Sequence, residues 1–313
     1  MKTLALHMIV RNNEKELAST LECVVGLFDQ IIIVDTGSTD KTIEVAKFYG
    51  AEVYEFPWVD DFAAARNVGL SKVICDWAMW LDTGDIIKPE SLVKFIGMKQ
   101  SDAFQTDDYD LIWVPLNRQI DEQGNPLLTL LVPRVARMAS NPQWERPVHE
   151  TLVVKDSRNT VFDLASIDDP FTDVHGGSER NLRILDKMIK NGDNSPRTKF
   201  YRGQELFMLK RYKEAAEQWT EYLVTKNNTW EDYQAYMGIG FCYHESGDKL
   251  TAVGAWLKAI GCDPTQPDAW LYIANVYKEI GQDGKASIFM QACVGMKQTQ
   301  DGRPRNQTMY IGL

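Results

Sequence analysis

The chain has 313 residues, which at about 150 residues per domain suggests about two domains. Hydrophobic residues make up 44% of the sequence and charged residues 25%, which argues against wholesale disorder. The net charge of -10 disfavours a protein that coats nucleic acid, because such binding neutralises phosphates with Lys and Arg. No run of about 18 apolar residues occurs, so no membrane span is predicted.

The cysteines and the N-terminus bear on the expected compartment. The five cysteines are scattered, and none forms a C-x-x-C pair, which favours a reducing environment over a disulfide framework. Residues 1–7 run directly into a strand-like segment and lack the apolar core and cleavage site of a signal peptide. We therefore expect a cytoplasmic protein.

The first half of the sequence alternates between strand and helix patterns. Apolar strands are predicted at residues 3–10, 30–34, 51–58 and 77–82, with helices at 16–28, after residue 40 and at 61–73. This rhythm predicts an α/β layer with a parallel sheet, in which ligands bind at the carboxyl ends of the strands. Those ends carry Arg11, Asn12, Asp35, Asp82 and Asp85.

Turn chemistry adds two local predictions. Ser38 or Thr39 is expected to cap the helix that follows residue 40. Residues 111–116 and 127–137 flank a polar, turn-rich stretch at 121–125, which predicts a β-hairpin.

The second half lacks strand signals and repeats itself. Gly203, Gly240 and Ala274 occupy equivalent places in three helical segments, with 37 residues between the first two and 34 between the last two. This spacing of small residues, with aromatic residues around them, resembles the tetratricopeptide repeat. Such repeats stack into a solenoid that binds peptide segments or another subunit, so we expect recognition or homodimerisation here.

The strand ends lack glycine-rich phosphate loops. No G-x-G-x-x-G, G-x-x-x-x-G-K-[ST] or G-x-S-x-G motif follows a strand, which disfavours dinucleotide binding, P-loop chemistry and α/β-hydrolase chemistry. Carboxylates at a sheet edge instead favour a nucleoside diphosphate held through Mn²⁺ or Mg²⁺.

Four blocks of sequence resemble the family 2 glycosyltransferases of the GT-A fold: residues 10–14, 33–40, 62–67 and 80–82. Three further blocks, at residues 133–135, 148–150 and 175–182, are similar to the branch with a C-terminal repeat domain, which includes bacterial peptide S-glycosyltransferases. The resemblance implies a mixed-sheet, Rossmann-like GT-A domain at 1–178, a linker helix at 179–194 and an all-α tetratricopeptide-repeat domain at 195–313.

The resemblance also implies a nucleotide site. Arg11, Asn12 and Asp35 would bind the nucleoside, commonly uridine, and Arg66 would meet the donor. Asp82 would open the metal-binding D-x-D motif, in which Gly84 stands where the family has its second Asp.

The departure at Gly84 leaves the remaining metal ligands open. Asp85, displaced by one residue, would reach Mn²⁺ or Mg²⁺ directly or through water, or Asp82 and another ligand would suffice. His175 occupies the place of the family's additional ligand, and its neutral imidazole would complete the coordination.

An inverting transferase needs a base that deprotonates the acceptor. Glu150 is the first candidate, and His149 would orient it or contact phosphate. Asp60 and Asp61 are lesser candidates, because an acidic pair before a helix also serves as an N-cap.

The predicted function is a metal-dependent, inverting transfer of a sugar from a UDP-sugar to a peptide or protein. A surface glycan is a second possible acceptor, and a modified base in viral DNA, which the charge disfavours, is a third. The alternative is a catalytically degenerate scaffold protein, which only Gly84 favours.

Overall fold

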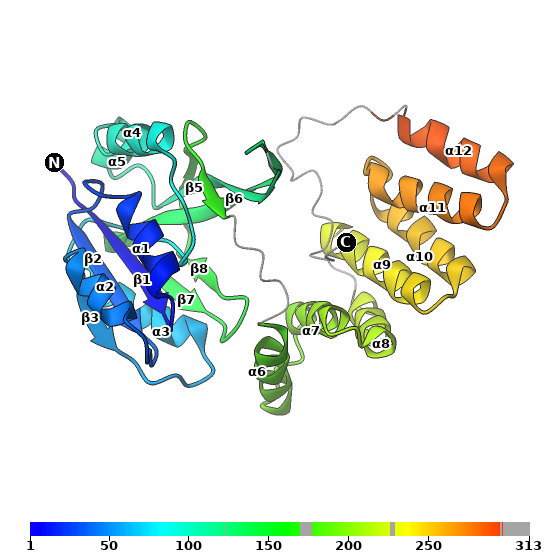
Figure 1. Ribbon diagram of the computed structural model, residues 1–313, viewed down its shortest axis with the longest axis horizontal. Coiled ribbons are helices and arrows are strands. Elements are labelled where there is room, and N and C mark those ends of the chain that lie inside the picture. The colour runs from blue at the N-terminus through cyan, green and yellow to red at the C-terminus, as the bar shows by residue number, and fades with distance from the viewer. Residues whose placement is uncertain (122, 170–176, 226–228, 295, 297–313) are drawn as a thin grey trace. The chain divides into compact units, whose positions relative to one another are not determined.

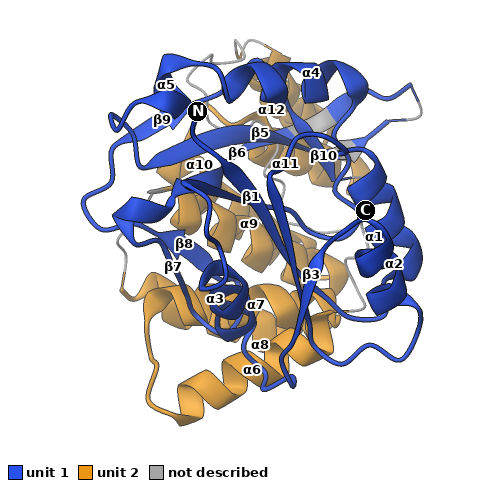
Figure 2. Cartoon of the chain, turned by 90° about the vertical axis from the view of Figure 1, so that its left-hand side faces the viewer, with its two compact units in different colours: residues 1–172 blue, residues 173–313 orange. Residues whose placement is uncertain are grey.

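The computed structural model describes residues 1–121, 123–169, 177–225, 229–294 and 296. The chain divides into two compact units, Met1–Thr172 and Asp173–Leu313 (Figure 2). The first unit is an α/β domain and the second is helical, so the predicted fold class is confirmed. Helix α6 (Ser178–Lys190), in the region expected as a linker helix, belongs to the second unit.

The first unit is built on a mixed β-sheet with the strand order β10-β5-β6-β4-β1-β2-β3, in which β9 also pairs with β5 (Figure 1). The strands are β1 (Leu4–Val10), β2 (Gln30–Asp35), β3 (Glu52–Glu55), β4 (Trp77–Trp80), β5 (Leu111–Ile120), β6 (Pro126–Arg137), β9 (Asn159–Val161) and β10 (Ile167–Asp169). Strands β1 to β4 are mutually parallel, and β6 runs antiparallel to both β4 and β5. The predicted parallel strands and hairpin are confirmed.

Helices cover both faces of this sheet. They are α1 (Glu14–Glu22), α2 (Thr42–Phe48), α3 (Phe62–Leu70), α4 (Pro89–Met98) and α5 (Asp102–Gln105). In Figure 2, α1 and α2 lie on one side of the sheet and α3 on the other. Leu6 and Met8 of β1 share a buried cluster with Leu17 of α1, whereas Ala78 of β4 packs in a separate cluster with Leu70 of α3. Burial on both faces explains why these strands are nearly continuous apolar runs.

A small antiparallel sheet lies beside α3. It consists of β7 (Gln143–Glu145) and β8 (Thr151–Val153), and it follows a short 3-10 helix, η1 (Met138–Ser140). Asn67 of α3 fixes this sheet, because its side chain both donates to and accepts from the backbone of Trp144 at 2.8 Å. The loop between β7 and β8, which contains the predicted His149 and Glu150, is thereby placed near α3.

The second unit consists of helix pairs. After α6 come α7 (Pro196–Met208), α8 (Tyr212–Leu223), α9 (Thr229–Glu245), α10 (Lys249–Cys262), α11 (Pro267–Glu279) and α12 (Asp283–Val294). Trp219 of α8 donates to a carbonyl of α7, and Trp256 of α10 makes the equivalent bond to α9. A Cβ at Gly203 would lie 2.6 Å from Trp219 Nε1, and one at Gly240 would collide with Trp256. The repeated packing confirms the predicted tetratricopeptide architecture.

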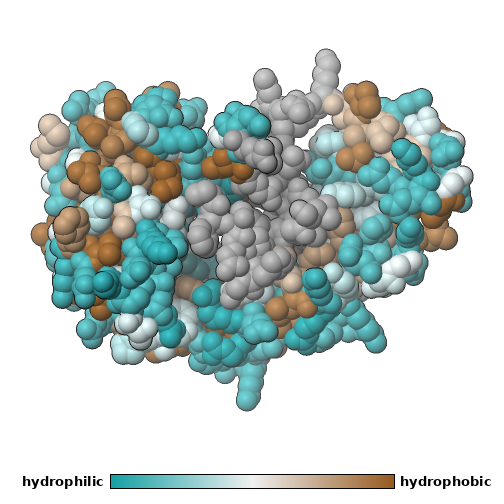
Figure 3. Space-filling view, viewed as in Figure 1, coloured by the Kyte–Doolittle hydropathy of each residue, from teal (hydrophilic) through white to brown (hydrophobic). Residues whose placement is uncertain are grey.

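The surface in Figure 3 is largely hydrophilic, with hydrophobic residues in small patches between polar ones. Within the part of the chain that the structure describes, no helix is long and apolar enough to cross a membrane.

Candidate active site

The candidate site lies at the carboxyl ends of β1, β2 and β4. The chain leaves β1 through α1 toward β2 on one side, whereas β4 pairs with β1 on its other side. This reversal makes the space beyond β1 and β4 the topological switch point, where open α/β sheets bind ligands. Arg11 and Asn12 follow β1, Asp35 ends β2, and Asp82 lies just beyond β4.

Asp35 organises the turn after β2. Its buried carboxylate accepts hydrogen bonds from the backbone N–H groups of Gly37 and Ser38 at 3.0 Å. Asn12, held in a left-handed conformation (φ 51°), donates its backbone N–H to Ser38 Oγ and accepts from Thr39 N at 2.7 Å. The loops that follow β1 and β2 are therefore tied together, and the exposed Arg11 lies beside them.

Arg66 of α3 joins two of the predicted catalytic residues. Its Nη2 lies 2.7 Å from Asp82 Oδ1, and its Nε lies 2.7 Å from Glu150 Oε1. The arginine is only 4% exposed, and burial alone would lower its pKa. The two carboxylates outweigh burial and hold the pKa of Arg66 above its ordinary value, so it remains a cation.

Aromatic rings surround this guanidinium. The Arg66 guanidinium carbon lies 4.8 Å from the Trp80 ring centre and 4.7 Å from that of Trp144. Such cation–π contacts favour a buried cation and fix its orientation. Arg66 Nη1 is buried without a hydrogen-bond partner among the described residues.

His7 lies close to this cluster. Burial, helped by the positive charge of Arg66, lowers the pKa of His7 to about 3, so its ring is neutral at pH 7. The ring packs edge-on against Trp144, with 6.3 Å between centroids.

In the turn at residues 82–85, where the sequence departs from the D-x-D motif, the two carboxylates point in different directions. Asp82 keeps a side chain that is 50% exposed, whereas Asp85 is turned inward and is 3% exposed. Asp85 Oδ2 accepts from the backbone N–H of Asp82 and forms an ion pair with Arg134 Nη1, both at 2.9 Å. Gly84, at φ 97°, supplies the left-handed backbone that this turn requires. Asp82 is thus presented to solvent, and Asp85 is held within the protein.

The charges around this turn set the protonation of both carboxyl groups. Desolvation would raise the pKa of Asp82, but the guanidinium groups of Arg66 and Arg134 outweigh it and hold that pKa below its ordinary value. Burial raises the pKa of Asp85 to about 6, against the opposing pull of Arg134. Asp82 is therefore ionised at neutral pH.

The segment that carries Glu150 is strained and anchored. Arg146 (φ 79°) and His149 (φ 51°) both adopt left-handed conformations that cost free energy for residues with side chains. The backbone N–H of Phe62, at the start of α3, donates to Pro147 O at 2.8 Å. Strain held by anchoring of this kind is typical of functional segments.

The remaining predicted residues fall into different places. Asp61 caps α3 by accepting from Ala64 N, and Asp60 accepts from the indole N–H of Trp58. His175 lies outside the described residues. Among the residues that the structure does describe, no group of three His, Cys, Asp or Glu side chains could hold a metal ion.

Other polar residues near Asp82 were not predicted. The charge of Arg118 in β5 helps to keep Asp82 ionised, and the negative charge of Asp169 in β10 helps to raise the pKa of Asp85. Arg134 lies within the block at residues 133–135, but no role was predicted for it.

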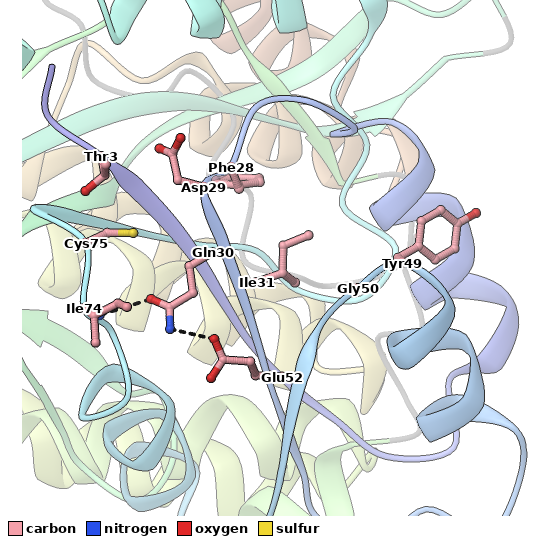
Figure 4. Close-up of a pocket in the computed structure, with 10 residues that line it drawn as sticks. All are labelled: Thr3, Phe28, Asp29, Gln30, Ile31, Tyr49, Gly50, Glu52, Ile74 and Cys75. Atoms are coloured by element: carbon pink, nitrogen blue, oxygen red, sulfur yellow. Dashed lines mark hydrogen bonds between the residues drawn. The ribbon is translucent and has the colours of Figure 1, made fainter.

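A separate pocket of about 580 Å³ lies at the opposite, amino-terminal ends of the parallel strands (Figure 4). Gln30 crosses it and bonds both Glu52 and the backbone of Ile74. None of the predicted site residues lines this pocket, so it is separate from the candidate site.

A comparison with known protein families matches most of the first unit. Residues 6–152 match the family model described as Glycosyl transferase family 2. A TPR repeat-containing protein of Synechococcus elongatus is 30% identical over 150 residues, which cover 48% of this chain and 35% of the relative. The prophage-derived glycosyltransferase SunS of Bacillus subtilis is 23% identical over 224 residues, which cover 69% of this chain and 52% of SunS.

Among solved structures, the helical protein MamA from Desulfovibrio magneticus is similar at 20% identity, with a TM-score of 0.36 over 40% of this chain and 70% of that one. The alignments with the Synechococcus elongatus protein and with SunS span 35% and 52% of the lengths of those two proteins.

Proposed function

Since residues 6–152 form a domain of glycosyl transferase family 2, we propose that this protein transfers a sugar from a UDP-sugar to a peptide or protein acceptor. The predicted resemblance to this family is confirmed, and the donor, the metal and the acceptor are our inference. The observation that carries the proposal is the direct link, through Arg66, between the half-exposed Asp82 and Glu150 at the switch point.

Asp35, Asn12 and Arg11 form the nucleoside side of the site in this proposal. The Asp35 carboxylate and the loop that it orders end β2, beside the loop after β1. Carboxylate and amide groups at these two strand ends suit the ring N–H and ribose hydroxyls of uridine, which need hydrogen-bond partners.

Asp82 is the residue that we assign to Mn²⁺ or Mg²⁺. Such ions are often held by one or two carboxylates together with substrate phosphates, and the exposed, ionised Asp82 fits that requirement. The ion would stabilise the charge that develops on the diphosphate leaving group. Asp85, engaged by Arg134, supports the turn in this assignment, and His175 remains a predicted ligand.

Glu150 is the proposed base. Arg66 holds its Oε1, so the second carboxylate oxygen is the atom that we assign to the acceptor proton. His149, next to it in the strained segment, would contact phosphate or orient the acceptor. Because Arg66 is buried and bound to both carboxylates, its proposed part is to fix their positions rather than to touch the donor.

The helical repeats supply the acceptor-binding part of the proposal. Stacked helix pairs present an extended surface that suits a peptide chain. Removing the second unit should therefore spare donor hydrolysis but weaken transfer to the true acceptor.

One observation favours a second candidate, a scaffold protein without catalysis. The displaced Asp85 is buried against Arg134 and leaves Asp82 as the single exposed carboxylate of the D-x-D region. A protein of this kind would not cleave any nucleotide sugar.

Release of UDP from a panel of UDP-sugars by the full-length protein, with Mn²⁺ or with a chelator, separates the two candidates. We expect Mn²⁺-dependent release, reduced at least ~100-fold in Asp82→Asn, because a single electrostatic stabiliser of the transition state contributes on that scale. Release that is equally fast in chelator would contradict the metal assignment. No release from any donor would favour the scaffold.

A further inference from the structure

Arg134 is a buried cation outside the predicted site. It lies on β6, is 1% exposed, and forms its ion pair with Asp85, which is itself buried. Buried ion pairs often contribute little net stability, because desolvation offsets the attraction between the charges. Stability alone therefore gives a weak reason for placing this pair directly behind Asp82.

One route from Arg134 to Asp82 runs through the backbone. The carboxylate that Arg134 holds also accepts the Asp82 N–H at 2.9 Å, and Asp85 N donates back to Asp82 O at 3.1 Å. Gly84 N is fixed from a third direction by Thr20 Oγ1 at 2.9 Å. Arg134 thus orients the side chain of Asp85, which closes the turn that carries Asp82.

A second route runs through Trp80 to the Asp82 side chain. The Arg134 guanidinium carbon lies 3.7 Å from the Trp80 ring centre, and its Nη1 donates to Trp80 O at 3.3 Å. The indole N–H of Trp80 donates to Pro133 O, next to Arg134. The same ring contacts the guanidinium of Arg66, whose Nη2 holds Asp82 Oδ1.

We propose that Arg134 is a positioning residue, which fixes Asp82 through Asp85 on the backbone side and through Trp80 and Arg66 on the side-chain side. This inference rests on the proposed function. Its consequence is that the planar guanidinium, and not only its charge, sets where the exposed carboxylate meets the diphosphate and its metal. A lysine at this position would keep the charge but lose both the flat ring contact and the fork geometry.

Arg134→Lys and Arg137→Lys form a matched pair for the test. Arg137 lies on the same strand and pairs with the buried Asp110 through a 2.6 Å contact, but it belongs to a different ion cluster. Both full-length variants are compared with wild type for thermal unfolding and for kcat and KM of Mn²⁺-dependent UDP release, at a temperature where all are folded.

We expect Arg134→Lys to lower kcat at least ~10-fold, as loss of a supporting partner behind a metal ligand typically does. Arg137→Lys should lose comparable stability and keep its kcat. An equal effect on kcat in both variants, or none in Arg134→Lys, would overturn the proposal. If Arg134→Lys fails to fold, Asp85→Asn replaces it, with the same expected loss of kcat.

Crystal structures of wild type and Arg134→Lys separate this inference from the proposed function. If wild type releases no UDP, the proposed function fails, but the position of Asp82 can still be compared. We expect the Asp82–Arg66 contact of 2.7 Å to be broken or lengthened in the variant. An unchanged Asp82 would refute the positioning role.

Discussion

Removal of Arg66 should destabilise the first unit strongly. The substitution Arg66→Met keeps an apolar stem between Trp80 and Trp144 but leaves Glu150, whose side chain is only 14% exposed, without its partner. Breaking a buried ion pair from one side costs about 3–5 kcal/mol, because a charge remains uncompensated. Asp82 adds less, since its side chain is half-exposed and solvent screens its charge.

This loss converts into a measurable shift. Each kcal/mol lowers the unfolding temperature of a 150–250-residue domain by roughly 2–4 °C, so the first unit of Arg66→Met should unfold ~6–20 °C lower. The assay is calorimetry of the full-length protein, with urea unfolding as an independent measure. The double variant Arg66→Met/Glu150→Gln is the control, because it also removes the stranded charge and should recover a large part of the loss.

The outcome that refutes this reasoning is a loss below ~1 kcal/mol in the single variant, which is the value of a solvent-screened surface pair. A double variant less stable than the single one would show that Glu150 has other partners that matter more.

Two further predictions concern packing and charge elsewhere in the chain. Asp110→Asn should cost ~1–3 kcal/mol at pH 7 in urea unfolding, because Asp110 is buried but the arginine charge that remains on Arg158 is half-exposed and screened by solvent. Hydrogen bonds, led by that of Arg158, hold the pKa of Asp110 well below its ordinary value. The difference in unfolding free energy between Asp110→Asn and wild type should therefore persist above pH ~4 and shrink as the pH falls further. A difference in unfolding free energy that does not change with pH would contradict this prediction. Gly240→Ala should cost at least ~1–3 kcal/mol because its methyl group would collide with Trp256. Gly254→Ala, whose Cβ would meet open space, should instead gain up to ~1 kcal/mol in the same melting experiment, and equal effects of the two would contradict the packing argument.

Much of the fold could be predicted because its signals are local. The apolar runs that became β1, β2 and β4 are buried on both faces, and the pairing of Gly203 with Trp219 recurs at Gly240 in the next helix pair. Such patterns can be recognised without knowing any contact between distant residues.

The helix cap after β2 was predicted wrongly. Ser38 or Thr39 was expected to cap the helix, but α2 begins at Thr42, whose N–H donates to Asp40 Oδ1 at 3.0 Å. Ser38 and Thr39 instead bind Asn12, which comes from the loop after β1. The N-cap position is Lys41, whose side chain makes no capping bond, because the two expected capping residues are held by a loop 26 and 27 residues away along the chain.

The contacts among the candidate site residues could not be predicted from the sequence. Asp82, Glu150 and Arg66 were named from separate sequence blocks, and nothing local showed that one buried guanidinium joins the two carboxylates. The inward turn of Asp85 depends on Arg134, which is 49 residues away along the chain. Pairings of this kind follow from the tertiary fold, so a spacing of acidic residues could not reveal them.

Binding of UDP to the full-length protein by calorimetry, with Mn²⁺ and with chelator, tests the central claim most directly. That claim is that the switch-point edge of the sheet holds a nucleoside diphosphate through Asp35 and a metal at Asp82. We predict binding that weakens in chelator and is largely lost in Asp35→Ala. Asp29→Ala, which removes a carboxylate from the opposite edge of the sheet, should bind as wild type does. Absence of UDP binding to wild type, or equal binding by Asp35→Ala, would contradict the account.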